Sequence, residues 1–205
     1  MAYYLIRHGE TSWNKDNRIQ GWTDISLSEL GLKQAFVLAQ ALKDIPIHYV
    51  YSSDLMRAHQ TAQAYESMTG KKAIKDALLR EIHFGQWEGK TWQEIIDENK
   101  DAYGSGLYDN PDSRTHLGES MNMFKKRAAS HFRSIIERHP FDHVALFTHG
   151  GNIRMIILEI LNQDIDFKNH IQIDNASITV IDKNHEGKLV IVSINDTTHL
   201  KRWNL

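Results

Sequence analysis

The sequence predicts a three-layer α/β/α sandwich around a mostly parallel sheet that contains one antiparallel strand. Short apolar segments alternate with longer segments of helical periodicity along most of the chain, which is typical of parallel strands joined by helices. Residues 178–181 and 189–194 are separated only by a polar turn and predict a closing hairpin. No linker or repeat divides the 205 residues, so we expect a single domain over residues 1–205.

The first part of the chain has a strand–helix–strand pattern. Residues 2–6 are apolar and are soon followed by a glycine, which predicts a buried strand. Between residues 28 and 43 apolar side chains recur every three or four positions, which predicts a helix. Residues 48–51 are the next short apolar segment and predict the second strand.

A second helix is predicted over residues 55–68. The Ser52-Ser53-Asp54 sequence supplies capping residues for its start, and Gly70 marks its end. Residues 73–77 follow as a third strand.

The composition changes after Glu81. Residues 83–119 contain five glycines and the turn sequence Asn110-Pro111-Asp112, which predicts a loop-rich lid with one short helix at residues 92–99. His83 is expected on the surface or in packing contacts. The aromatic side chains of this segment are expected to pack under the loop rather than to hold a substrate: Trp87, Trp92 and Tyr108.

The alternation returns after this segment. Apolar positions at helical spacing from Met121 to Ile136 predict a long helix that ends near Pro140. Residues 143–148 predict a buried strand, and the Gly150-Gly151 pair is followed by a further helix.

The composition excludes several classes of protein. Basic residues number 24 and acidic residues 26, so the net charge of −2 argues against a nucleic-acid-binding protein, which normally has a basic excess. The absence of cysteine excludes disulfides, thiolate metal sites and cysteine nucleophiles. We find no membrane span and no signal peptide, and therefore expect a cytoplasmic protein that does not bind membranes.

Two histidines follow predicted strands in matching contexts. His8 lies between Arg7 and a glycine, and His149 precedes Gly150, so each imidazole is expected at the carboxyl end of a strand, where such sheets bind ligands. The two histidines and a carboxylate such as Glu81 could bind zinc, but the permanent charge of Arg7 would repel a divalent ion. With Arg57 near another strand end, the pattern favours a pocket for a phosphate dianion.

The motifs resemble the histidine phosphatase (phosphoglycerate mutase-like) superfamily. They occur in the family's order over nearly the whole chain, and their combination is specific, although a lone Arg-His-Gly would be a weak signal. The matching segments are Arg7-His8-Gly9-Glu10-Thr11, Asn14, Gln20-Gly21-Trp22, Leu27-Ser28-Glu29-Leu30-Gly31, Ser52-Ser53-Asp54-Leu55-Met56-Arg57-Ala58, Thr61-Ala62, Leu79-Arg80-Glu81-Ile82, Gly118-Glu119-Ser120 and Thr148-His149-Gly150-Gly151.

The resemblance implies a role for each matching residue. His8 would attack phosphorus and form a phosphohistidine, and Glu81 would protonate the leaving alcohol and then activate water. A third group would surround the phosphoryl oxygens and stabilise their charge, namely Arg7, Asn14, Arg57 and His149. Further residues would line the phosphate pocket or its mouth, namely Gln20, Gly21 and Gly150.

The resemblance favours the phosphatase branch, which is related to broad-specificity phosphatases and α-ribazole phosphatase. We expect metal-independent hydrolysis of a small phosphorylated metabolite, without a cofactor. One alternative is a phosphoglycerate mutase that depends on 2,3-bisphosphoglycerate, and a second is a non-catalytic protein that binds phosphorylated ligands. The sequence leaves the substrate and a homodimer open.

The segment after Glu81 distinguishes the phosphatase interpretation from the mutase alternative. It resembles the phosphatase branch, and it reaches Gly118-Glu119-Ser120 within about forty residues, a shorter path than the mutases' insertion. The chain also ends at Trp203-Asn204-Leu205, just past the last predicted strand, so no tail is expected to close the pocket. Retention of a mutase intermediate depends on excluding water, and we therefore expect water to be the usual phosphoryl acceptor.

Overall fold

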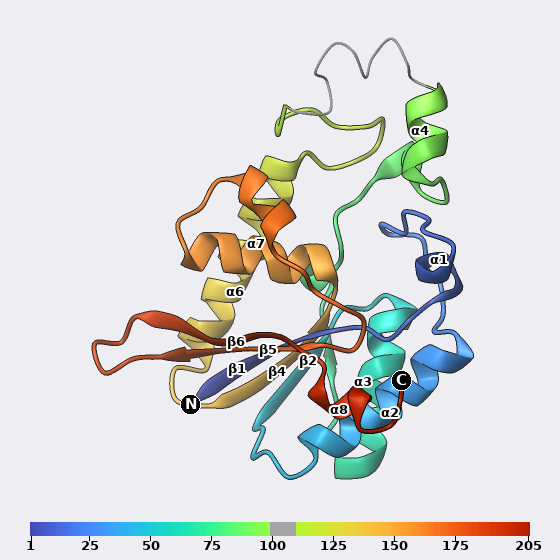
Figure 1. Cartoon of the computed structure of the whole chain (residues 1–205). Coiled ribbons are helices and arrows are strands. Elements are labelled where there is room, and N and C mark those ends of the chain that lie inside the picture. Colours follow the sequence, from blue (N-terminus) through green and yellow to red (C-terminus); the bar gives the residue numbers. More distant parts are fainter. Residues whose placement is uncertain (99–109) are drawn as a thin grey trace.

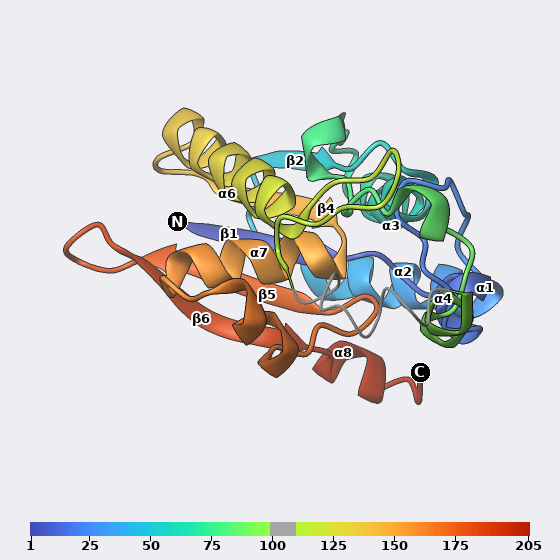
Figure 2. The ribbon, with the colours of Figure 1, turned by 90° about the horizontal axis from the view of Figure 1, so that it is seen from above.

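The computed structural model describes residues 1–98 and 110–205 and contains a six-stranded sheet between two layers of helices (Figure 1, Figure 2). The strand order is β3-β2-β4-β1-β5-β6. The strands are β1 (Ala2–Arg7), β2 (Tyr49–Ser52), β3 (Ile74–Lys75), β4 (His143–Thr148), β5 (Ile178–Lys183) and β6 (Leu189–Asp196).

The directions of the strands confirm the predicted fold class. β1 pairs in parallel with β4, and β2 pairs in parallel with both β3 and β4. β5 is antiparallel to its neighbours β1 and β6, so it is the one reversed strand of the described sheet.

Helices cover both faces of the sheet. The α-helices are α1 (Ser12–Lys15), α2 (Glu29–Leu42), α3 (Met56–Thr69), α4 (Trp92–Glu98), α6 (Met121–Arg138), α7 (Gly150–Ile160) and α8 (Thr198–Lys201). Three 3₁₀ turns connect other elements, namely η1 (Ala77–Leu79), η2 (Gly85–Trp87) and η3 (Ile165–His170). In Figure 1, α6 and α7 lie on one face of the sheet, and α2, α3 and α8 lie on the other.

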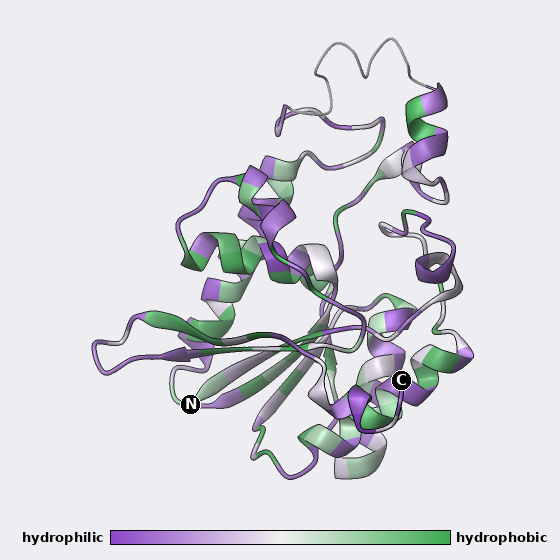
Figure 3. Ribbon diagram, in the orientation of Figure 1, coloured by the Kyte–Doolittle hydropathy of each residue, from purple (hydrophilic) through white to green (hydrophobic). Residues whose placement is uncertain are grey.

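The alternation of side chains along β4 divides the core into two clusters. Val144 and Leu146 pack with α6 and α7, whereas Ala145 and Phe147 pack with α2 and α3. Successive side chains of a strand point to opposite faces, so a strand covered on both sides is apolar throughout. Figure 3 shows this concentration of hydrophobic residues in the central strands and in α7. Burial of each aliphatic side chain contributes about 1.5–3 kcal/mol to the stability of the fold. This packing on both faces fixes the positions of the strand ends that carry the site.

The predicted helices agree with the structure to within about two residues at their ends. α2 begins after Ser28, whose side chain accepts a hydrogen bond from the Gly31 amide. α3 ends at Gly70, which has the left-handed φ of 73° that favours glycine. The short helices α1 and α8 were absent from the sequence prediction because four residues carry too little periodicity.

Two local predictions were wrong. The third strand covers only Ile74–Lys75, because the Asp76 side chain accepts a hydrogen bond from the Leu78 amide and starts η1. The Ser52-Ser53-Asp54 sequence does not cap α3, whose N-cap residue is Leu55. Instead, the Met56 amide donates to the carboxylate of Asp24, at 2.6 Å.

The predicted helix of the 83–119 segment is present as α4, from Trp92 to Glu98. Trp92 contacts Trp87 and Phe84 edge-to-face, with ring centroids 6.0 and 6.2 Å apart, in agreement with a packing role. Asn99, Tyr103 and Tyr108 lie outside the described residues. Within 1–98 and 110–205 no helix is both long and apolar enough to cross a membrane.

Candidate active site

The register between β1 and β4 brings the two predicted histidines together. Arg7 pairs with Thr148 at the ends of these strands, and the His8 amide donates to the Thr148 carbonyl at 3.0 Å. The rings of His8 and His149 lie with centroids 5.2 Å apart. Both side chains are buried. Parallel pairing of distant strands thus places both imidazoles at one edge of the sheet, as the sequence predicted.

His8 has a defined tautomer in this position. Its Nδ1 lies 2.7 Å from the Gly9 carbonyl oxygen, which can only accept, so Nδ1 carries the proton and donates it. Burial, followed by the charges of Arg57 and Arg7, holds the His8 pKa well below its usual value. The imidazole is therefore neutral near pH 7, and its Nε2 keeps a free lone pair.

Two guanidinium groups flank His8, that of the fully buried Arg57 and that of the partly buried Arg7. Arg57 donates to the carbonyls of Gly21 and Thr23, and Arg7 donates to the carbonyl of Ile173. Burial lowers the pKa of each arginine to about 10, so both stay charged at neutral pH. The Nε atom of each is buried without a hydrogen-bond partner, and no carboxylate of the described residues lies within ion-pairing distance of either guanidinium. Buried cations in this state form a site for an anion.

His149 is held by a residue whose role the sequence did not reveal. Its Nε2 lies 2.9 Å from the Ser53 hydroxyl, while its Nδ1 is buried without a partner. Burial, then the charge of Arg57, keeps the His149 pKa well below its usual value. Ser53 follows β2, which pairs with β4, and its amide donates to the carbonyl of Phe147. The position of Ser53 after a strand was the available signal, but it was read as a helix cap.

Glu81 lies beside the N-terminus of α7. Its Oε2 accepts from the Gly151 amide at 2.9 Å, and its Oε1 accepts from the Ile82 amide at 3.0 Å. A Cβ atom at position 151 would lie 2.1 Å from Glu81 Oε1, so a larger residue there would displace the carboxylate from this position. Glu81 and Gly151 also line a cavity of about 540 Å³. One carboxylate thus faces both the helix N-terminus and an open volume.

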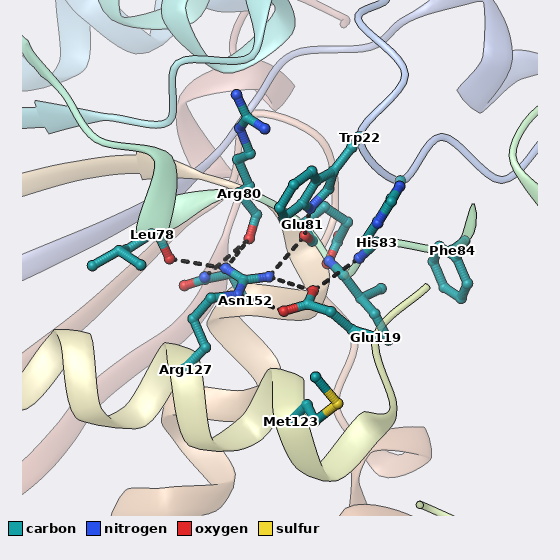
Figure 4. A network of polar contacts seen from close by, with 12 residues as sticks. Trp22, Leu78, Arg80, Glu81, His83, Phe84, Glu119, Met123, Arg127 and Asn152 are labelled. Atoms are coloured by element: carbon teal, nitrogen blue, oxygen red, sulfur yellow. Dashed lines mark hydrogen bonds and ion pairs between the residues drawn. The ribbon is translucent and has the colours of Figure 1, made fainter. Parts of the chain in front are cut away.

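A partly buried ion pair holds the chain around Glu81 (Figure 4). Arg127 of α6 donates to the carbonyls of Arg80 and Glu81, both at 3.0 Å, and it forms two hydrogen bonds with Glu119. Glu119 also accepts from the His83 amide. Glu119 belongs to the Gly118-Glu119-Ser120 motif, but no role was predicted for Glu119 or Arg127, because their contacts with residues 80–83 join segments 36 to 47 positions apart.

The remaining predicted residues have mixed positions. Asn14 Oδ1 accepts from the amide and hydroxyl of Thr11 in the cap of α1, and it also lies 3.3 Å from Asn175, which in turn donates to the His8 carbonyl. Asn14 is therefore close to the histidine loop but serves as a helix-cap residue, the alternative that its sequence context left open.

Gln20 and the predicted glycines lie around the guanidiniums. Gln20 is buried, and its Oε1 has no hydrogen-bond partner in the described structure. Gly21 has a φ of 52°, and its carbonyl accepts from Arg57. Gly150 opens α7, and an added Cβ would lie 3.4 Å from the Arg7 side chain.

His83 packs against an indole ring outside this group. Its ring stacks on Trp22 with centroids 4.6 Å apart, and Trp22 Nε1 donates to the Glu81 carbonyl. In the described part of the chain no group of three or more histidine, aspartate or glutamate side chains is arranged to hold a metal ion. Metal independence stays a prediction.

Comparisons with known proteins agree with this geometry. Residues 3–197 match the model of the histidine phosphatase superfamily (branch 1). The chain is 30% identical to "Probable phosphoglycerate mutase GpmB" of Yersinia pestis over 204 residues, which cover 98% of this chain and 95% of the relative.

Two solved structures share the fold. A mutant phosphoserine phosphatase from Entamoeba histolytica in complex with phosphoserine has a TM-score of 0.85 and 33% identity, covering 97% of this chain and 98% of that one. A mycobacterial glucosyl-3-phosphoglycerate phosphatase in complex with VO₃ has a TM-score of 0.84 and 27% identity, covering 96% and 99%. By family model, sequence and fold, this chain belongs to branch 1 of the histidine phosphatase superfamily.

Proposed function

We propose that the protein hydrolyses small phosphomonoesters through a phosphohistidine formed on Nε2 of His8. The observation that carries this proposal is the His8 ring, whose Nδ1 is held by the Gly9 carbonyl, beside two guanidiniums whose buried Nε atoms have no hydrogen-bond partner among the described residues. A neutral imidazole is a nucleophile, and unpaired buried N–H groups bind and orient a dianion. The E. histolytica phosphatase in complex with phosphoserine supports a substrate of this kind.

The phosphoryl oxygens would be held by buried donors. Arg7 and Arg57 supply two fixed charges, and His149 supplies Nδ1–H when the Ser53 hydroxyl donates to its Nε2. The Gly150 amide and the side-chain nitrogen of Asn14, whose Oδ1 is engaged in the cap of α1, would complete the binding group, and Gln20 and Gly21 would line its mouth. Donors that are already oriented stabilise the charge of the transition state without reorganisation.

Glu81 would transfer the proton. In the first step His8 Nε2 forms a bond to phosphorus, the ester P–O bond breaks, and Glu81 gives its proton to the leaving alcohol. In the second step Glu81 takes a proton from water, which attacks the phosphohistidine and releases phosphate and neutral His8. No metal is needed because two guanidiniums supply the positive charge.

Mutase activity is the second candidate, and the name of the Yersinia relative favours it. The first half-reaction is the same, but the phosphoryl group returns to a bound product. We propose water as the usual acceptor. Conversion of 3-phosphoglycerate to 2-phosphoglycerate far faster than phosphate release, and stimulated by 2,3-bisphosphoglycerate, would contradict this.

The proposal is tested with His8→Ala and a matched control, His185→Ala, which alters an exposed histidine of the β5–β6 hairpin. Labelled substrate and a quench without acid should trap label on His8 of the wild type and the control. His8→Ala should retain the fold, by circular dichroism, and lose turnover. Label on another residue, or an active His8→Ala variant, would refute the assignment of His8 as the nucleophile.

Turnover should also survive EDTA. A loss of turnover that zinc or magnesium restores would refute metal independence.

A further inference from the structure

The cavity next to Glu81 has a positively charged wall. Its volume is about 540 Å³, and its lining includes Glu81 and Gly151 on one side and three cationic side chains, those of Arg18, Arg154 and Lys168. The Glu81 carboxylate oxygens already accept from backbone amides. Positive charge in this cavity therefore exceeds negative charge.

Arg154 is held in place with its charge unpaired. It lies on α7, one turn after Gly150 and Gly151, and so it shares their helix face. Its Nε donates to the Ile171 carbonyl at 2.7 Å, which fixes the guanidinium. Asp174 attracts it from a distance, but no carboxylate of the described residues lies within 4 Å of it. Its two terminal nitrogens have no hydrogen-bond partner among those residues.

Lys168 faces the same cavity from η3. No carboxylate in the described ranges lies within ion-pairing distance of its ammonium group. Arg18 differs, because it donates to the Gly89 carbonyl and pairs with Glu94 at 3.1 Å. Arg154 and Lys168 are thus the two cations of this wall that remain available to a ligand.

We infer that the physiological substrate carries a second anionic group on its leaving alcohol, and that Arg154 and Lys168 bind this group. The inference rests on the proposed function, because Glu81, the proposed proton donor to the leaving oxygen, lines the same cavity as Arg154 and Lys168. A planar guanidinium and an ammonium that line the same cavity suit a carboxylate or a phosphate. The substrate class is an acidic phosphomonoester, and Arg154 and Lys168 are its specificity residues.

Two substrate pairs distinguish the sources of the second charge. O-Phosphoserine and O-phosphoethanolamine differ only by a carboxylate, and fructose 1,6-bisphosphate and fructose 6-phosphate differ by a phosphate. The wild type should have a kcat/KM at least about 10-fold higher for the more acidic member of one pair, since a hydrogen bond to a charged group is worth this factor or more. Equal kcat/KM values within both pairs would overturn the inference.

The variants Arg154→Gln and Lys168→Gln assign the preference to these side chains. Each should reduce it about 10-fold, mainly through KM, and Arg154→Lys should retain more of it than Arg154→Gln because it keeps the charge. Lys125→Gln is the control: this α6 lysine donates to the Gln163 carbonyl outside the cavity, and its loss should leave the preference unchanged. A preference that survives in both glutamine variants would overturn the assignment.

The same assays separate this inference from the proposed function. p-Nitrophenyl phosphate needs no second anion, so wild-type hydrolysis of it through phospho-His8 supports the proposed function whatever the pairs show. If no monoester is hydrolysed and no phosphohistidine forms, the proposed function itself fails. Melting temperatures of the variants verify that each is folded.

Discussion

His8 has the properties of a nucleophile because of contacts that act on a single ring. The Gly9 carbonyl fixes the proton on Nδ1, and burial beside Arg57 and Arg7 opposes a second proton. Neither guanidinium forms a direct ion pair with a carboxylate of the described residues, so the surroundings that keep the imidazole neutral also attract a dianion. We propose Glu81 as the group that carries a proton to the leaving alcohol.

Glu81→Gln tests that role at the residue scale. The amide can still accept from the Gly151 amide but cannot donate a carboxyl proton, so alkyl phosphates should lose about 10²–10⁴-fold in rate. p-Nitrophenyl phosphate has a good leaving group and should lose much less in the phosphorylation step, measured as the burst of nitrophenol. Glu186→Gln, in the exposed β5–β6 hairpin, is the control. Equal losses for aryl and alkyl esters would make Glu81 a positioning residue and direct attention to His83.

At the scale of elements, α6 controls the segment that carries Glu81. Arg127 contacts the carbonyls of Leu78, Arg80 and Glu81, so one helix side chain binds the end of η1 and the residues after it. Glu119 holds the other side of the same segment through the His83 amide. The pair therefore fixes backbone positions, from which the Glu81 side chain reaches the Gly151 amide.

Arg127→Met is expected to reduce both stability and proton transfer. The loss leaves Glu119 and three carbonyls with fewer partners, at a cost on the order of 2–3 kcal/mol in the free energy of unfolding, measured by denaturant. Alkyl phosphates should again lose more kcat than p-nitrophenyl phosphate, because the carboxylate of Glu81 is displaced. A uniform loss for both esters would indicate a purely structural role.

Two further variants sharpen this test. Arg133→Met, on the exposed face of the same helix, removes a surface ion pair with Glu159 and should cost at most about 1 kcal/mol. Adding Glu119→Gln to Arg127→Met should recover part of the stability, since it removes the unpaired charge, but not the kcat for alkyl esters.

At the scale of the whole molecule, the site lowers the stability of the fold. Two imidazoles and the Arg57 guanidinium are buried, and Arg7 is partly buried, where β1, β2 and β4 end, and the apolar clusters on both faces of the sheet offset their desolvation. The stability of the protein should therefore respond both to protons and to anions.

Acid should destabilise the fold through His8 and His149. Both have pKa values below that of an unfolded histidine. Below about pH 6.5 these histidines therefore bind protons in the unfolded chain but not in the native site. The free energy of unfolding then falls by about 1.4 kcal/mol per pH unit for each imidazole, until its native pKa is reached. The difference between wild type and His8→Asn, measured by denaturant from pH 7.5 to 5.5, should change with this sign. Parallel pH profiles would refute it.

Anions should act in the opposite direction. Inorganic phosphate at neutral pH should raise the melting temperature of the wild type, because it binds the native cationic pocket and not the unfolded chain. Arg57→Met should reduce this effect of phosphate, whereas Arg133→Met should retain it. Sodium chloride at equal ionic strength controls for general salt effects.

The sequence alone determined the elements and the residues that the sheet would bring together. Residues 143–148 were predicted with the bounds of β4, and the strand ends named His8 and His149, because periodicity and glycine turns act over a few neighbouring residues. The place of Arg57 near another strand end added it to the predicted pocket, and the ordered motifs implied the acid–base role of Glu81. Local sequence signals gave wrong predictions where a residue distant in sequence makes the contact instead. The Met56 amide at the start of α3 donates to Asp24, 32 positions away, and the Ser53 hydroxyl contacts His149, 96 positions away.

Only the tertiary structure decided the chemical state of the site. The depressed pKa values of His8 and His149, the unpaired Nε atoms of the arginines and the hold of Arg127 on Glu81 depend on burial and on contacts between residues far apart in sequence. The tertiary structure likewise determines which cavity-lining cations are paired. Arg18 pairs with Glu94, whereas Arg154 and Lys168 have no ion-pair partner among the described residues. Sequence patterns specify which groups reach a strand end, whereas desolvation and long-range packing set their charge, because both depend on everything that surrounds them in space.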